Sequence, residues 1–188
     1  MEVPVMSILS RAVAVMVLGL VGAGVPAAQA GTSGPSANAC TLSAHVTLSP
    51  GISMTPTVGT IATHAPGTMT CTGVVNGATV TGPGPVVIKG TYGTGATLAL
   101  QGGDTCVQGS GSAIVTASIP TTAGTQKITL YVETLALGNA GAAAGISPDG
   151  TRNGALFQFS PDRGEDCTTV PVTGIAVSSQ ALNIRSAG

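Results

Sequence analysis

Two histidines, His45 and His64, are the side chains of this chain best suited to acid–base chemistry. A serine hydrolase would need one of them beside a serine and an orienting acid, usually with the serine in a Gly-x-Ser-x-Gly elbow. The segment Gly109-Ser110-Gly111-Ser112 lacks that spacing. His45 lies among threonines and serines on the polar side of a predicted strand, and His64 lies in a predicted loop. We therefore predict that the protein is not an enzyme. A hydrolase that uses either histidine with a loop acid is the alternative.

Carboxylates gather in the loops, and carboxylate oxygens are the ligands that calcium prefers. Two acidic turns, 102–106 and 164–167, each end at a cysteine. If those cysteines are joined, Asp104, Glu165 and Asp166 come close together. Three carboxylates repel one another unless a cation or a basic side chain lies between them. We therefore consider a calcium-dependent binding module at these loops, and we predict no other cofactor.

The four cysteines all follow residue 39, and an even number fits two disulfides in an oxidising compartment. Zinc is the alternative, but no pair has the C-x-x-C spacing. Sequence alone leaves three connectivities open. Cys40 and Cys71 each alternate with apolar residues on the buried side of a predicted strand, which favours pairing them. The similar acidic turns before Cys106 and Cys167 favour pairing those two.

The chain begins with the features of a secretory signal peptide. Arg11 precedes an apolar run at 12–24, and Ala28-Gln29-Ala30 is a small-x-small cleavage site. The run is short for a membrane-spanning helix, so an uncleaved anchor is the less favoured alternative. We predict a signal peptide at 1–30, a flexible lead-in at 31–39 and one domain at 40–188. The expected location is extracellular, with association to the cell wall as an extension of it.

The composition excludes several classes of partner. Charged residues make up 7% of the chain and the net charge is −1, whereas ordinary domains have about 25% charged residues. The chain therefore lacks the basic footprint expected for nucleic acid or anionic lipid. Two tyrosines, two phenylalanines and no tryptophan leave little material for a sugar-binding platform. The core must be built from aliphatic residues, with disulfides offsetting the backbone entropy of 28 glycines.

Period-two alternation of apolar and polar residues predicts half-buried strands along most of the chain. It is clearest at 40–49, 68–75, 112–119 and 127–135, with shorter strands at 78–81, 86–90, 96–101, 155–159, 170–177 and 181–184. Asn76-Gly77 predicts a tight hairpin turn. Pro56 limits 52–63 to an edge strand at best, and the Ala/Gly segment 138–145 is predicted as a loop rather than a short helix.

Short strands separated by Gly and Pro predict an all-β fold, either a sandwich or a barrel. We favour an antiparallel β-sandwich, immunoglobulin-like or related, because no periodic repeat is visible. A cysteine opening the first strand, the turn Leu48-Ser49-Pro50-Gly51 and the segment Thr70-Cys71-Thr72-Gly73 resemble small secreted actinobacterial β proteins of unassigned function. The Cys40–Cys71 spacing is similar to the disulfide between the first two strands of pilin-type immunoglobulin-like subunits. Neither resemblance implies a catalytic residue.

The outward strand positions are predicted to carry mainly threonine and serine, with few of the charges that protect a sheet edge from pairing. We therefore predict a secreted, non-catalytic structural or interaction protein. Its partner would be an unknown protein or a component of the cell envelope, or a second copy through self-association. No nucleic acid is expected, and no membrane after removal of the signal peptide.

Overall fold

The computed structural model describes residues 37–94 and 103–185. The predicted signal peptide and the predicted strand at 96–101 lie outside these ranges. Within them, no helix is long and apolar enough to span a membrane. The first strand, β1 (Ala37–Ile52), begins inside the predicted lead-in and continues past Pro50-Gly51, where the sequence predicted its end.

All of the large elements in the described ranges are antiparallel strands. They are β1, β2 (Gly59–Thr63), β3 (Gly67–Cys71), β6 (Gly84–Tyr92), β7 (Gln108–Thr121), β8 (Gly124–Leu137), β9 (Ala140–Ile146), β10 (Arg152–Pro161) and β11 (Val172–Arg185). A separate hairpin joins β4 (Val74–Val75) to β5 (Ala78–Thr79). Its turn confirms the prediction at Asn76-Gly77, because both residues have positive φ angles, 48° and 78°.

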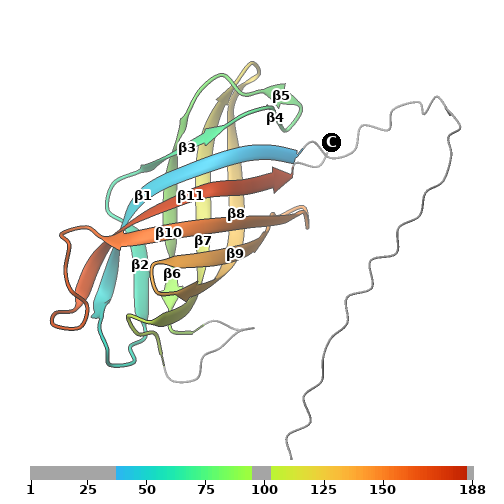
Figure 1. Cartoon of the computed structure of the whole chain (residues 1–188). Helices are drawn as coiled ribbons and strands as arrows, with labels where there is room; N and C mark the ends of the chain where they lie inside the picture. The colour runs from blue at the N-terminus through green and yellow to red at the C-terminus, as the bar shows by residue number, and fades with distance from the viewer. Residues whose placement is uncertain (1–36, 95–102, 186–188) are drawn as a thin grey trace, which may run out of the picture. The chain divides into compact units, whose positions relative to one another are not determined.

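The nine strands form one sheet that closes on itself, because β1 pairs with β11 along almost its whole length. Figure 1 shows β1, β11 and β10 side by side on the near face, with β6, β7 and β8 crossing behind them. β2 and β3 lie end to end between β1 and β6, so eight strand positions surround the interior. An eight-position closed sheet encloses just enough space for side chains or one small ligand.

This pairing corrects two predictions about edges. β2 pairs with β1 on one side and β6 on the other, so it is not an edge strand. Pro56 precedes the paired residues and removes no hydrogen bond from the ladder. Each of the nine described strands has partners on both sides, so an argument from unprotected edges does not apply to them. The all-β antiparallel fold is confirmed, whereas a sandwich of two facing sheets is not confirmed.

The predicted alternation is confirmed where inward side chains fill the interior. Ala113, Val115, Ala117 and Ile119 of β7 are all buried, as predicted. They pack in one cluster with residues from β1, β3, β6 and β8, among them Met69 and Leu130. Both predicted disulfides are present. Cys40 and Cys71 face each other in the β1–β3 ladder and are buried, so the predicted shared face of these strands is confirmed.

The prediction for 138–145 is wrong, because Ala140–Ile146 forms strand β9. Alanine and glycine have weak strand propensity, but β9 is paired along its length with β8 and β10. Tertiary pairing therefore decides this segment. Its inward positions carry only glycine and alanine, which leaves space beside it inside the closed sheet.

Candidate functional site

The interior of the closed sheet contains a cavity of about 350 Å³. Its lining comes from β1, β6, β7, β8, β9, β10 and β11 and is mainly apolar. Four buried core residues, Met69, Val86, Ile119 and Ile128, are not part of the lining. The interior is therefore divided into a packed end, which contains these four residues, and a cavity end, where β7 begins and β8 finishes.

Small residues at inward positions create this space. Gly109 and Gly111 begin β7, and Ala143 and Gly145 stand on β9, and all four line the cavity. A Cβ atom at Gly141 would collide with the ring of Phe157, so this glycine allows the ring to lie flat against β9. Strand β9, which the sequence analysis predicted as a loop because of its glycines and alanines, therefore contributes to the space of the cavity.

Three of the four aromatic residues line this one cavity: Tyr92, Phe157 and Phe159. The two phenylalanine rings lie side by side on β10 with centroids 6.1 Å apart. Tyr92 packs against Leu48 and Val172 at the cavity end. Sequence reasoning counted these aromatics and found them few, but it did not locate them. Alternation over 153–159 places both phenylalanines on one face and could have grouped them.

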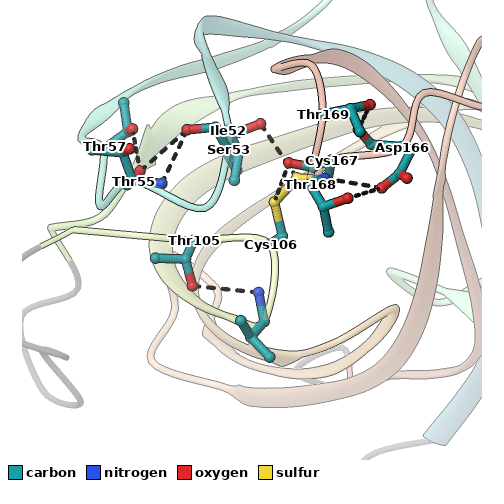
Figure 2. The surroundings of a disulfide bond; sticks show 11 residues. Ile52, Ser53, Thr55, Thr57, Thr105, Cys106, Asp166, Cys167, Thr168 and Thr169 are labelled. Atoms are coloured by element: carbon teal, nitrogen blue, oxygen red, sulfur yellow. Dashed lines mark hydrogen bonds between the residues drawn. A yellow bond between two sulfur atoms is a disulfide. The ribbon is translucent and has the colours of Figure 1, made fainter.

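The Cys106–Cys167 disulfide joins two segments at the cavity end, and both cysteines line the cavity. Polar contacts connect the disulfide to a third segment. Figure 2 shows the bridge beside the chain that follows β1. The Cys106 N–H donates to the Ser53 carbonyl oxygen at 3.1 Å, and Cys167 Sγ lies 3.4 Å from the Ile52 carbonyl oxygen. The bridge therefore fixes the segment before β7 to the segments after β1 and before β11.

Asp104 is the ionisable acid of the cavity lining and is 4% exposed. Its Oδ1 accepts a hydrogen bond from the Ser110 N–H at 2.8 Å. Burial raises the pKa of Asp104, and the N–H groups of Ser110 and Gly93 oppose that shift without cancelling it. Nearby Tyr92 donates its hydroxyl to the Pro50 carbonyl. Burial, with a smaller effect from the Asp104 charge, raises the pKa of Tyr92.

Replacing Asp104 with Asn should change how stability depends on pH. Below 3.8, the ordinary pKa of this carboxyl group, the folded and unfolded chains both hold the proton. As the pH rises above that value the unfolded chain ionises first, so the wild-type protein should lose stability relative to Asp104→Asn. Urea denaturation of both proteins between about pH 3 and pH 7 measures this difference.

Asp166→Asn is the matched control, because the Asp166 pKa is shifted in the opposite direction. The hydroxyl and N–H of Thr168 both donate to this carboxylate and lower the pKa of Asp166. Its contribution to stability is present above the unfolded pKa and is lost as the pH falls. Parallel pH profiles for the two variants would contradict this assignment.

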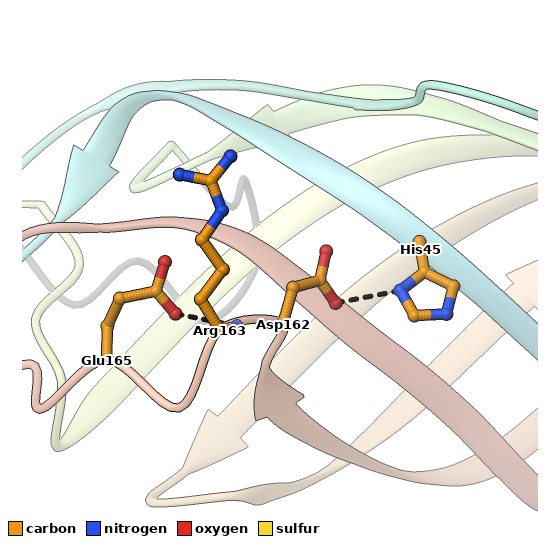
Figure 3. A network of polar contacts seen from close by, with 4 residues as sticks. All are labelled: His45, Asp162, Arg163 and Glu165. Carbon is orange, nitrogen blue, oxygen red and sulfur yellow. Dashed lines mark hydrogen bonds and ion pairs between the residues drawn. The ribbon is translucent and has the colours of Figure 1, made fainter.

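The structure does not bring together the three carboxylates of the predicted calcium site. Asp104 is buried in the cavity wall, whereas Asp166 is bonded to Thr168 in an exposed turn. Glu165 Oε2 accepts the Arg163 N–H at 3.0 Å (Figure 3). Among residues 37–94 and 103–185, no group of three acidic, histidine or cysteine side chains could hold a metal ion. The disulfide joins the two turns, but their carboxylates face different surroundings.

His45 contacts Asp162 on the outer face of the closed sheet, with 2.8 Å between Nδ1 and Oδ1 (Figure 3). The histidine side chain is 71% exposed, and exposed pairs of this kind contribute about 0–1 kcal/mol to stability. In the described part of the chain, no serine hydroxyl is hydrogen-bonded to His45. His64 is exposed in the connection between β2 and β3. The arrangement supplies a histidine–acid pair without a nucleophile.

One row of residues on the outer face departs from the predicted threonine and serine surface. Ile114, Tyr131 and Ile146 are cross-strand neighbours on β7, β8 and β9 and are about half exposed. Lys89 pairs with Ile114 at one end of this row, and Arg152 pairs with Ile146 at the other. These three residues therefore form an apolar row across the strands, with a cation at each end.

Comparisons of the chain with protein-family models, with curated protein sequences and with solved structures found no match. The resemblances to secreted actinobacterial β proteins and to pilin-type subunits therefore stay predictions. What the site can do has to be argued from its geometry. That geometry is an apolar interior cavity with aromatic walls, one buried acid and both histidines outside it.

Proposed function

We propose that the protein is a secreted, non-catalytic binding protein that holds one small apolar molecule inside its closed sheet. The observation that carries this proposal is the convergence of Tyr92, Phe157 and Phe159 on a single apolar cavity. A chain with four aromatic residues in total would gain most stability by packing them in its core. Here the packed end is entirely aliphatic and sulfur-containing, while the aromatics surround a space.

The size of the cavity supports a ligand rather than a few water molecules. A volume of about 350 Å³ lies within the range of about 300–1,000 Å³ that small-molecule sites occupy. Apolar cavities of this kind stay dry and bind apolar molecules, because water needs polar partners that such walls do not supply. Binding would remove apolar surface of both partners from water, which is the dominant favourable term in such complexes.

Two disulfides support an extracellular location, because they persist in oxidising compartments. A carrier or scavenger of apolar molecules acts in water outside the cell, where its ligand is poorly soluble. The hydrolase alternative has less support, since the His45 side chain is exposed on the outer face of β1 and does not line the cavity. Association with an envelope partner or with a second copy stays a prediction.

Filling the cavity with a larger side chain should weaken the binding of an apolar ligand without unfolding the protein. Ala143 is an inward residue of β9 that lines the cavity, and Ala143→Leu places three more carbon atoms in that space. We expect the protein to bind the hydrocarbon fluorophore pyrene, and Ala143→Leu to bind it at least about tenfold more weakly. Fluorescence titration measures both affinities.

Ala142→Leu is the matched control, because Ala142 directly precedes Ala143 in β9 and is exposed on the outer face. It adds the same atoms outside the cavity, so its affinity for pyrene should equal that of the wild-type protein. If the wild-type protein fails to bind pyrene, or if both variants bind it equally well, the cavity is not a ligand site.

A further inference from the structure

We infer that the natural ligand is an uncharged amphiphile, an apolar molecule with one hydroxyl or carbonyl group, and that Ser179 forms the hydrogen bond to that group. This inference rests on the proposed function, since it assigns a chemical class to the ligand of the same cavity. It is carried by three observations: a buried hydroxyl without a partner, apolar neighbours on both sides of it, and a cavity lining without basic residues.

Ser179 lies on β11 and faces the cavity. It follows Ile175 and Val177 at alternate positions, and all three residues line the cavity. Ser179 is 6% exposed, and its Oγ has no hydrogen-bond partner in the described part of the chain. A buried hydroxyl left without a partner costs about 1–3 kcal/mol. Such a group in a native fold calls for an explanation, and a bound ligand is one.

The neighbours of Ser179 cannot satisfy it. Leu42 of β1 and Phe157 of β10 stand opposite Ser179 on the two adjacent strands, and both side chains line the cavity. Both ladders shift register immediately after this position. Such bulges commonly re-aim a side chain beside a binding site. A water molecule at this point would need two to four polar partners, and the flanking side chains are apolar.

The charge of the lining selects against ionised ligands. Among the described residues, those around the cavity include Asp104 but no lysine, arginine or histidine. A carboxylate or phosphate group would therefore be buried without a cation and near an acid, at a large cost in free energy. Asp104 is already bonded to the Ser110 N–H, so it does not wait for a basic ligand. A neutral hydroxyl or carbonyl group of a ligand matches a buried serine hydroxyl that has no other partner.

Ser110 also lines the cavity and has a second buried hydroxyl without a partner in the described part of the chain, but its place in the strand differs. It lies on the same side of β7 as Ile114, whose side chain is exposed on the outer face. Ser179 shares its side of β11 with cavity-lining residues, so the hydrogen bond to the ligand is assigned to Ser179.

Displacement of bound pyrene by ligands of equal chain length tests the inference. We expect 1-decanol to displace pyrene at a concentration at least about tenfold below that of decanoate at neutral pH. Ser179→Ala should weaken 1-decanol about fivefold, as expected for one lost hydrogen bond. The same variant should leave the affinity for pyrene itself within about twofold, because a hydrocarbon makes no hydrogen bond to the serine.

Ser178→Ala is the matched control, since Ser178 is the adjacent and exposed residue of β11, and it should change neither affinity. Decanoate displacing pyrene as well as 1-decanol would overturn the assignment of an uncharged ligand. An unchanged affinity of Ser179→Ala for 1-decanol would overturn the role of the serine, even if pyrene still binds. Failure of the wild-type protein to bind pyrene would instead overturn the proposed function.

Discussion

Replacing both Cys40 and Cys71 with Ala is expected to lower the free energy of unfolding by about 3–4 kcal/mol. The disulfide closes a loop with a sequence separation of 31 residues. Removing it lets the unfolded chain explore conformations that the cross-link forbids. Both cysteines are also buried in the main core cluster, so each loses packing contacts on replacement. Urea denaturation of the oxidised wild-type protein and of the double variant measures the difference.

Replacing both Cys106 and Cys167 with Ala is the comparison for the Cys40–Cys71 double variant. Its sequence separation of 61 residues predicts a similar or slightly larger effect from the unfolded chain, about 4 kcal/mol. These cysteines line the cavity end rather than the packed end, so their loss should also weaken the binding of pyrene. A loss below about 1 kcal/mol for Cys40→Ala/Cys71→Ala would contradict the prediction.

The parts of the fold that sequence predicts are those that depend on neighbouring residues. Strict alternation located the inward face of β1 and β7, and Asn76-Gly77 located a hairpin turn, because each signal is complete within a few residues. The Cys40–Cys71 pairing followed from the same alternation. By contrast, the β1–β11 ladder joins the two ends of the described chain. No local pattern records which strands become neighbours, so closure of the sheet could not be predicted.

The candidate site was missed for a related reason. Asp104 was predicted as a loop acid of a calcium site, but it is buried in the cavity wall and the Ser110 N–H donates a hydrogen bond to its carboxylate. The glycines and alanines of 140–146 have weak strand propensity and favour a loop. Hydrogen-bonded pairing with β8 and β10 nevertheless makes this segment strand β9. A cavity forms where inward positions carry small side chains. Its presence follows from the arrangement of several strands and not from any single motif.

Ile119→Ala is expected to lower the free energy of unfolding by about 3–4 kcal/mol. Ile119 is fully buried at the packed end, in a core cluster of aliphatic, methionine and cysteine side chains. Close packing leaves little room for the neighbours to move into the space that the missing carbons leave. Since whole domains are stable by about 5–15 kcal/mol, this change should remove a large part of the stability of the protein. Urea denaturation measures the loss.

Val132→Ala gives the comparison that links stability to the proposed function. Val132 lines the cavity and is partly buried, so its truncation enlarges an existing space instead of creating a new one. We expect it to cost less than half as much as Ile119→Ala, and Ile114→Ala on the exposed outer face to cost less than about 0.5 kcal/mol. Equal losses at Ile119 and Val132 would mean that both ends are equally well packed. In that case the protein would have no cavity to fill, whereas unequal losses would locate stability at one end of the closed sheet and ligand binding at the other.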